Sequence, residues 1–267
     1  MPAMPHSTVI RLEKAATDAG FDLEPVRDGD WIRFATSRSP VPVWLMTLAE
    51  SLFIAAVSQQ KVIAALVDHG STHVSPLPPG AAGARCVTSW EALANLLYRV
   101  IPLARTLPDE LLHVFQARTA NLPRSTEAER LVVQRVGQDI VRDGLLEYWH
   151  GRCAVTGLAV PELLRASHIK PWADCETDAE RLDVFNGLLL APNWDAAFDA
   201  GFITFDDDGR LLVSERLDAD ARDKLGLAAG TRLAGLGAGH RRLVYPLGRR
   251  RNGDGEPNPI SGKNANL

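Results

Sequence analysis

The sequence predicts an α+β protein with an N-terminal domain of mixed helices and strands, followed by a long helix and a smaller C-terminal module. Short segments rich in β-branched and aromatic residues alternate with Asp-Gly and Ser-Pro turns in the first half. A strongly periodic helical stretch follows a polar linker. We therefore expect an N-terminal domain over 1–120, a second domain over 121–235 with its leading helix at 126–149, and a basic, flexible tail over 236–267.

Composition excludes several classes of protein. Of 267 residues, 46% are apolar and 23% charged, with a formal net charge of −4, which excludes a disordered chain and gives no general basic surface. No run of 18 apolar residues exists, so no spanning helix is expected, and the N-terminus shows no secretion signal. Three widely spaced cysteines, Cys86, Cys153 and Cys175, argue against a disulfide framework. We expect a cytoplasmic protein without membrane contact.

Elements of the N-terminal domain follow from periodicity and from turn residues. Ser7 is the expected cap of a first helix that Gly20 ends, and Ser89 is the expected cap of a later one. The expected helices are 7–19, 61–67, 89–103 and one opened by Pro108, and the expected strands of an antiparallel meander are 31–35, 41–48 and 52–57. The Pro/Gly-rich stretch 75–84 predicts a loop.

The leading helix of the second domain has a capping box, because Thr126 is followed three residues later by Glu129. Its expected apolar face consists of Leu131, Val132, Val136, Ile140, Leu145 and Trp149. The opposite face is polar, with Arg130, Gln134, Arg135, Gln138 and Arg142. These long side chains are either a solvated helix surface or a set of contacts to a phosphate backbone.

The side chains that could take part in catalysis lie between residues 150 and 206. An extended segment, Leu163 to Ile169, contains His168 and stops before Pro171, and the dipeptide Asn186-Gly187 predicts a turn. A short helix then places Asp195 and Asp199 four residues apart on one face. Two like charges at this spacing repel each other unless a cation lies between them, and hard divalent cations prefer oxygen ligands.

Four fragments of this region carry a family resemblance. They are C-x-V-T-G from Cys153, A-S-H-I-x-P-W from Ala166, N-G-L-L-L from Asn186, and D-x-x-F-D-x-G-x-I-x-F from Asp195. In this order, over Thr126 to Phe205, they resemble the HNH (ββα-metal) nucleases, and most closely a bacterial, restriction-type branch. The resemblance implies a C-terminal ββα-metal module after the leading helix. The first 120 residues resemble no family that we can name.

The resemblance also implies roles for individual residues. His168 would be the general base that activates water, and Asn186 would orient it through the loop backbone. Asp195 and Asp199 lie where the wider family often places ligands of a divalent metal, here Mg²⁺ or Mn²⁺. Two positions depart from the family: Ser167 replaces a residue that is often a ligand, and Asn193 stands where many relatives have His. A structural zinc is not expected, since the cysteine pairs that would bind it are incomplete.

The expected activity is metal-dependent hydrolysis of DNA phosphodiester bonds, in restriction of modified or foreign DNA by analogy with the family. Expected DNA contacts are Arg130, Arg135, Arg142, Lys170 and the tail arginines 249–251.

Alternatives to this reading stay open. The protein could instead be a DNA-binding protein whose nuclease site has decayed, and the N-terminal domain could bind a protein partner rather than DNA. RNA as substrate and a homodimer are also open. Individually, His168 could be a strand-end histidine bonded to a carbonyl, Asp199 a turn cap, Asp195 a solvated helix residue and Asn186 a turn former.

Overall fold

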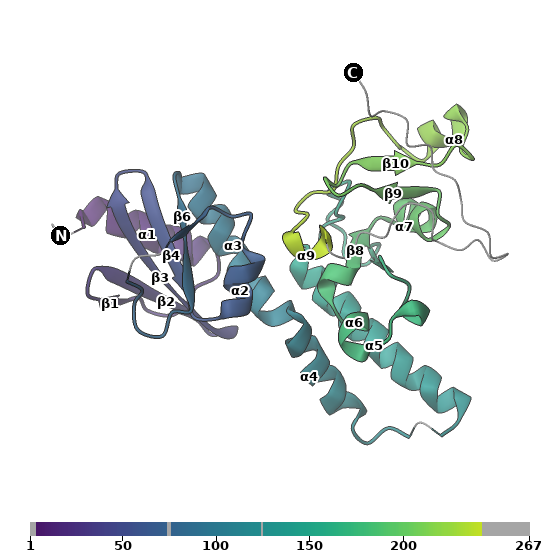
Figure 1. The fold of residues 1–267 in the computed structure, drawn as a ribbon, viewed down its shortest axis with the longest axis horizontal. Coiled ribbons are helices and arrows are strands. Elements are labelled where there is room, and N and C mark those ends of the chain that lie inside the picture. Colours follow the sequence, from purple (N-terminus) through teal and green to yellow (C-terminus); the bar gives the residue numbers. More distant parts are fainter. Residues whose placement is uncertain (1–3, 74–75, 124, 242–267) are drawn as a thin grey trace. The chain divides into compact units, whose positions relative to one another are not determined.

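The computed structural model describes residues 4–73, 76–123 and 125–241 and confirms a mixed α+β protein (Figure 1). The chain divides into two units, Met1–Glu110 and Leu111–Leu267. Among the described residues, no helix is both long and apolar enough to cross a membrane.

The first unit is built on a six-stranded antiparallel sheet with the strand order β1-β2-β3-β4-β6-β5. Its strands are β1 (Val26–Asp28), β2 (Trp31–Thr36), β3 (Ser39–Ala49), β4 (Leu52–Val57), β5 (Ser71–His73) and β6 (Gly83–Val87). The meander β2-β3-β4 matches the prediction. Three strands were missed: β1 and β5 have three residues each, and β6 begins at Gly83, inside the predicted loop. Gly83 fits there because a Cβ atom would lie 2.9 Å from Ile63 Cγ2.

Three helices accompany this sheet: α1 (His6–Asp18), α2 (Gln60–Ala65) and α3 (Trp90–Thr106). Ser89 caps α3 as predicted, by accepting a 3.0 Å hydrogen bond from the Ala92 amide. The predicted Ser7 cap is wrong, because α1 begins at His6 and Ser7 already lies in its first turn. Gly20 ends α1 with φ +95°, as expected for a helix stop. Helix α3 continues past Leu103 to Thr106 because its buried apolar side continues with it.

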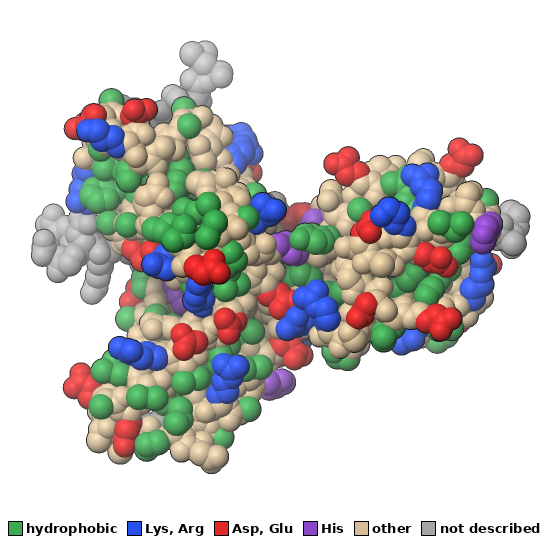
Figure 2. Space-filling model, turned by 180° about the vertical axis from the view of Figure 1, so that it is seen from behind, with side chains coloured by type: hydrophobic (Ala, Val, Ile, Leu, Met, Phe, Trp, Pro, Cys, Tyr) green, Lys and Arg blue, Asp and Glu red, His purple; other side chains and the backbone are tan. Residues whose placement is uncertain are grey.

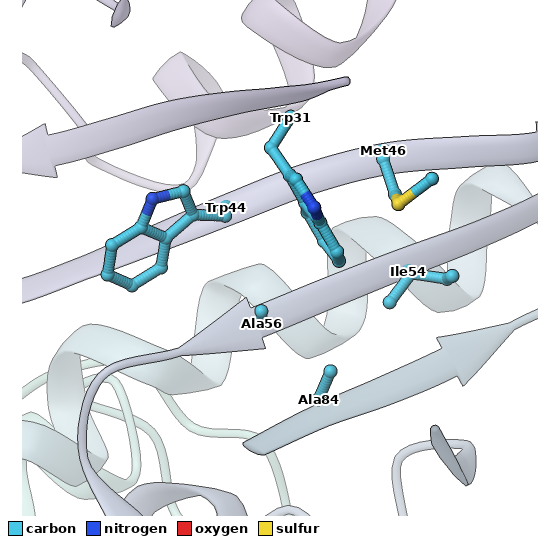
Figure 3. Packing of buried hydrophobic residues seen from close by; sticks show 6 residues of the cluster. All are labelled: Trp31, Trp44, Met46, Ile54, Ala56 and Ala84. Carbon is cyan, nitrogen blue, oxygen red and sulfur yellow. The ribbon is translucent and has the colours of Figure 1, made fainter. Parts of the chain in front are cut away.

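Both faces of the central strands are buried. One face carries Ile32, Phe34, Val43, Leu45, Ala55 and Val57, all under 3% exposed, and α3 contacts β3. The other face carries the cluster of Figure 3, where the Trp31 ring lies between Trp44 and Met46, and Ile54, Ala56 and Ala84 complete it. Leu77 and Ala81 of the Pro/Gly-rich loop pack against this cluster. The loop therefore covers the second face of the sheet.

The second unit combines helices with two separate two-stranded sheets. Its α-helices are α4 (Pro108–Thr119), which begins just before the division, α5 (Glu127–Tyr148), α6 (Asp178–Arg181), α7 (Pro192–Asp199), α8 (Ala219–Lys224) and α9 (Ala238–Arg241). Its 3₁₀ turns are η1 (Trp172–Asp174) and η2 (Val184–Asn186). Its antiparallel strand pairs are β7 (Arg165–His168) with β8 (Gly187–Leu190), and β9 (Ile203–Phe205) with β10 (Leu211–Val213).

Helix α5 starts with the predicted capping box, in which Thr126 Oγ1 accepts from the Glu129 amide and Glu129 Oε2 accepts from the Thr126 amide. Its predicted apolar face is only half right, since Leu131 and Val132 are 52% and 50% exposed. The buried stripe consists instead of Gly137, Ile140, Val141, Gly144, Leu145 and Tyr148. Two glycines belong to it because α4 and the loop after β7 approach the helix closely at these positions.

The predicted turn at Asn186-Gly187 is also wrong. Asn186 ends η2, and Gly187 starts β8 in an extended conformation with φ −142° and ψ 147°. Glycine is required here for space, because a Cβ atom would lie 2.7 Å from Leu145 Cδ1 of α5. The dipeptide therefore joins a 3₁₀ turn to a buried strand.

The last described residues belong to α9, where His240 is fully buried against the rings of Tyr148, Trp149 and Phe185. The rest of the predicted tail, 242–267, lies outside the described residues, and so do Arg249, Arg250 and Arg251. On the face drawn in Figure 2, positive and negative side chains are interspersed, and no large area carries a single sign.

Candidate active site

The pair β7-β8 followed by α7 forms a ββα arrangement that carries the predicted site residues on both sides of β7, with His168 on one side and Ser167 and Asp195 on the other. In the β7-β8 register, His168 faces Gly187 and Ser167 faces Leu188. All four residues of β8 are buried, because α5 contacts this strand. Pro192 opens α7 at its first turn, and Gly201, with φ +69°, follows its end. Helix α7 packs against β7.

His168 lies at the C-terminal end of β7 and is partly buried. Its Nε2 atom is 2.9 Å from the carbonyl oxygen of Arg181. A carbonyl oxygen only accepts hydrogen bonds, so Nε2 carries the ring proton in the neutral imidazole. Nδ1 is then the atom of the ring that accepts a proton. This is the protonation pattern that a general base requires.

Arg181, the last residue of α6, holds the loop around His168 and was not identified from the sequence. Its Nε donates to the Trp172 carbonyl at 3.3 Å, one Nη donates to the Cys175 carbonyl, and the other donates to Asp178 Oδ1 at 3.1 Å. The same residue supplies the carbonyl that faces His168. Nothing in the polar sequence between Trp172 and Asp183 distinguishes this arginine from a solvated one.

Asn186 is completely buried and connects three segments of the loop. Its Oδ1 accepts from the Lys170 amide at 2.7 Å, and its Nδ2 is within 3.4 Å of the Lys170 carbonyl, the Glu180 carbonyl and Cys175 Sγ. Its backbone carbonyl accepts from the Ile169 amide at 2.9 Å. These bonds fix the residues that directly follow His168. The contact of Asn186 is with this backbone and not with the imidazole.

Lys170 forms an ion pair with an acidic neighbour. Its Nζ lies 2.6 Å from Glu180 Oε1, and both side chains are mostly buried. This hydrogen bond raises the pKa of Lys170 and lowers the pKa of Glu180. If Lys170 contacts DNA as predicted, the contact would come from an ammonium group that is already paired with the Glu180 carboxylate.

Ser167 and Asp195 meet on the other side of β7. Ser167 is 1% exposed, and its hydroxyl donates a hydrogen bond to Asp195 Oδ1. Successive residues of a strand point to opposite faces, so Ser167 faces α7 while His168 faces η1 and α6. Asp199 lies one turn after Asp195 and is exposed. Asn193 is exposed, and its Nδ2 donates to the Leu225 carbonyl at 3.1 Å.

The oxygen atoms on this side fit a hard cation better than zinc. Two carboxylates one helical turn apart, with a serine hydroxyl beside one of them, are the type of donors that Mg²⁺ and Mn²⁺ accept. Among the described residues, no group of three or more His, Cys, Asp or Glu side chains could hold a metal ion. Mg²⁺ commonly takes only one or two protein carboxylates and completes its shell with water and phosphate.

The three arginines that we expected to contact DNA from α5 differ in their surroundings. Arg130 and Arg135 are exposed. Arg142 instead donates to the Pro161 carbonyl at 2.9 Å and to the Leu164 carbonyl at 3.3 Å. Arg142 thus fixes the turn that precedes β7. Sequence reasoning missed this role because periodicity places Arg142 on the polar face of α5.

Comparison with known proteins locates one family in this region. Residues 153–206 match the sequence model of a family described as HNH endonuclease. The matched span includes β7, β8 and α7, together with His168, Asn186 and Asp195. A search of curated proteins finds no match to the chain.

Proposed function

We propose, from the HNH endonuclease domain in the C-terminal half, that this protein is a metal-dependent endonuclease that hydrolyses DNA phosphodiester bonds. The observation that carries the proposal is the hydrogen bond from His168 Nε2 to the Arg181 carbonyl, because it leaves Nδ1 to accept a proton. The attacking nucleophile would be a water molecule that gives its proton to Nδ1 as it adds to phosphorus, while the P–O bond to the leaving sugar oxygen breaks and that oxygen takes up a proton from solvent. The imidazolium formed in this step is stabilised by the Arg181 carbonyl, which accepts from the opposite nitrogen.

Asp195 and Asp199 would hold the divalent metal, Mg²⁺ or Mn²⁺. A bound divalent ion would stabilise negative charge on the phosphate and on the leaving oxygen. Ser167 would keep the Asp195 carboxylate in one orientation, since its buried hydroxyl donates to Oδ1. Asn186 would keep the backbone after His168 in place through its bonds to Lys170 and Glu180.

The biological setting that we propose is restriction of modified or foreign DNA, with the first unit selecting the substrate. Arg130 and Arg135 would contribute phosphate contacts from the exposed face of α5. A cytoplasmic location is part of the proposal, and the three free thiols are compatible with a reducing compartment.

A second candidate is a DNA-binding protein with a decayed nuclease site. It is favoured by Ser167 and Asn193, which replace residue types that could bind a metal, and by the small number of acidic ligands among the described residues. This candidate predicts DNA binding without cleavage under any divalent metal.

Plasmid cleavage tests both candidates. We expect nicking or linearisation with Mg²⁺ or Mn²⁺ and none with EDTA. His168→Ala should lower the rate by roughly 10²–10⁴-fold with DNA affinity retained. The matched control is His113→Ala, which removes an exposed histidine of α4. Cleavage by His168→Ala at the wild-type rate would exclude the assigned base, and binding without cleavage would favour the decayed site. DNA of differing modification and an RNA of the same sequence identify the substrate.

The metal ligands need a separate measurement. Asp195→Ala and Asp199→Ala should each raise the Mn²⁺ concentration needed for half-maximal cleavage and weaken Mn²⁺ binding in calorimetry. Asp220→Ala serves as the control, because Asp220 is an exposed residue of α8 that pairs with Lys224 four residues later. Mn²⁺ binding that is unchanged in both α7 variants would contradict the ligand assignment while leaving His168 untouched.

A further inference from the structure

We propose that Trp172 is a positioning residue for His168 and that Gly137 of α5 provides the space in which Trp172 lies. This inference rests on the proposed function, since it assigns a task to a neighbour of the proposed base. It extends the site to a residue of the leading helix, outside the span that matches the nuclease family.

The indole ring of Trp172 contacts the imidazole ring of His168. The two ring centroids are 5.4 Å apart, and the ring planes meet at 84°, an edge-to-face geometry. The imidazole is therefore contacted by Trp172 at its ring and by the Arg181 carbonyl at Nε2. Together these contacts restrict rotation about the bond that joins the ring to Cβ, and this rotation decides where Nδ1 points.

Trp172 is itself held by its backbone. It is the first residue of η1, directly after Pro171, and its carbonyl accepts from Arg181 Nε at 3.3 Å. The guanidinium carbon of Arg181 lies 6.0 Å from the Trp172 ring centre, at the outer limit of a cation–π contact. Arg181 thus contacts Trp172 through its guanidinium group and His168 through its backbone carbonyl.

Gly137 is the reason that the indole fits against α5. A Cβ atom on this residue would lie 2.6 Å from Trp172 Cη2 and 3.2 Å from Cζ2, and also 3.3 Å from Phe115 Cε2. Glycine inside a helix costs about 1 kcal/mol relative to alanine, so local helix stability argues against it here. The close approach of the indole ring explains the glycine.

The consequence for catalysis follows from the geometry of proton transfer. A general base must lie within hydrogen-bond reach of the water that it activates, and an error of about 1 Å can cost about 100-fold in rate. A methyl group at Gly137 would displace the indole ring and, with it, the contact of Trp172 with the imidazole. Gly137 and Trp172 should therefore affect the chemical step more than substrate binding.

Steady-state cleavage by the full chain tests this. Gly137→Ala and Trp172→Leu should each lower kcat by roughly 10- to 100-fold, with KM changed by less than about 2-fold. Trp172→Phe, which keeps an aromatic ring, should recover most of the lost rate. Gly144→Ala is the packing control, because its Cβ atom would lie 2.6 Å from Leu111 Cδ1 of α4, and Trp172 is not among its nearest atoms. It should lower thermal stability without a comparable loss of kcat.

A readout independent of activity is the ¹⁵N and ¹H NMR spectrum of the His168 imidazole, assigned by its absence in His168→Ala. We expect a protonated Nε2 with slow exchange in the wild type, averaged signals in Gly137→Ala and Trp172→Leu, and a recovered wild-type pattern in Trp172→Phe. If the wild type cleaves no substrate, the proposed function fails, yet these spectra still decide whether Trp172 fixes the ring.

Three outcomes would overturn the positioning role. One is wild-type kcat together with unchanged His168 signals in both Gly137→Ala and Trp172→Leu. Another is a rise in KM alone on replacing Trp172, which would make Trp172 a substrate contact. The third is an equal loss of kcat in Gly144→Ala. Should Gly137→Ala fail to fold, the two Trp172 variants decide, because they remove atoms and add no clash.

Discussion

The six-stranded sheet of the first unit has apolar side chains buried on both faces, whereas the described part of the second unit has only two-stranded sheets. An isolated two-stranded hairpin is marginally stable in water. In the second unit, the two-stranded sheets are supplemented by side chains that form hydrogen bonds with the backbone of loops. These side chains include Asn186, Arg181, Asp183 and Arg142. The candidate active site lies among these loops.

This difference predicts how much stability each unit loses when a side chain is replaced. Burial of apolar surface is non-directional, so a small change in a core side chain costs roughly in proportion to the atoms removed. A buried hydrogen-bond network responds differently, because removal of one member leaves its partners desolvated and unsatisfied. We therefore expect single polar substitutions to be more damaging in the second unit than conservative apolar ones in the first, and pH effects to differ between the units.

The largest effect is expected for Asn186→Ala. Loss of the amide leaves the Lys170 amide and two carbonyls without their partner, and we expect a loss of about 3 kcal/mol in the free energy of unfolding of the second unit. Denaturant unfolding, with hydrogen exchange to localise the change, measures it. Asn193→Ala is the control, since Asn193 is exposed and should lose under about 1 kcal/mol. Equal losses in the two variants would remove the basis of the comparison.

Asp183→Asn should stabilise the second unit at high pH. Asp183 caps η2 by accepting from the Phe185 amide at 2.9 Å, and burial raises its pKa from 3.8 to about 6. A raised pKa means that the folded state favours the protonated form, so stability is highest below about pH 4 and is lost as pH rises through 6. Asparagine can keep the cap without the charge.

The gain from Asp183→Asn should be at most about 3 kcal/mol at pH 8 and should vanish near pH 4. Melting temperatures of wild type and variant across this range provide the measurement. A difference that stays constant with pH would show that the carboxyl group does not titrate in this way.

A smaller effect is expected for Ile54→Val in the first unit. Ile54 is fully buried in the tryptophan-containing cluster, and loss of one methylene there should cost about 1 kcal/mol. Calorimetry of the full chain should show this loss, and hydrogen exchange should place it in the sheet. A loss near that of Asn186→Ala would argue that the first unit is as sensitive as the second.

The smallest effect is expected at Asp22. Here the pH dependence of stability has the opposite sign to that at Asp183. Bonds from the Ser37 hydroxyl and amide lower its pKa to about 2, and the carboxylate is exposed. A lowered pKa gives stability that is present above about pH 4 and lost as pH falls through 2. Asp22→Asn should therefore differ from wild type at neutral pH and converge with it near pH 2. A pH series of melting temperatures should show this convergence, and a difference that grows on acidification would contradict it.

Local patterns predicted most of the regular elements and the ββα arrangement that carries the candidate site. The capping box of α5, the meander β2-β3-β4 and helix α7 each depend on neighbouring residues in the sequence, and all three appear in the structure. The order of His168, Asn186 and Asp195 likewise pointed to the ββα arrangement in which the structure has them.

The missed features depend on contacts between residues distant in the sequence. Gly137 reads as a weak point of a helix until the Trp172 ring is placed beside it, and Arg142 reads as a surface residue until the carbonyls of Pro161 and Leu164 are seen to face it. Gly187 reads as a turn residue until Leu145 is found against its backbone. Periodicity records which side of a helix is apolar but not which neighbour approaches it.

The three free thiols make the two units distinguishable to a chemical reagent. Alkylation requires an accessible sulfur, and Cys86 in the first unit is only partly buried. Cys153 and Cys175 are buried in the second unit, and burial raises the pKa of Cys175, whose sulfur also lies against the Asn186 amide. Modification of these two thiols therefore requires the loops around the site to open. The rate at which they are labelled, relative to Cys86, reports how often these loops open.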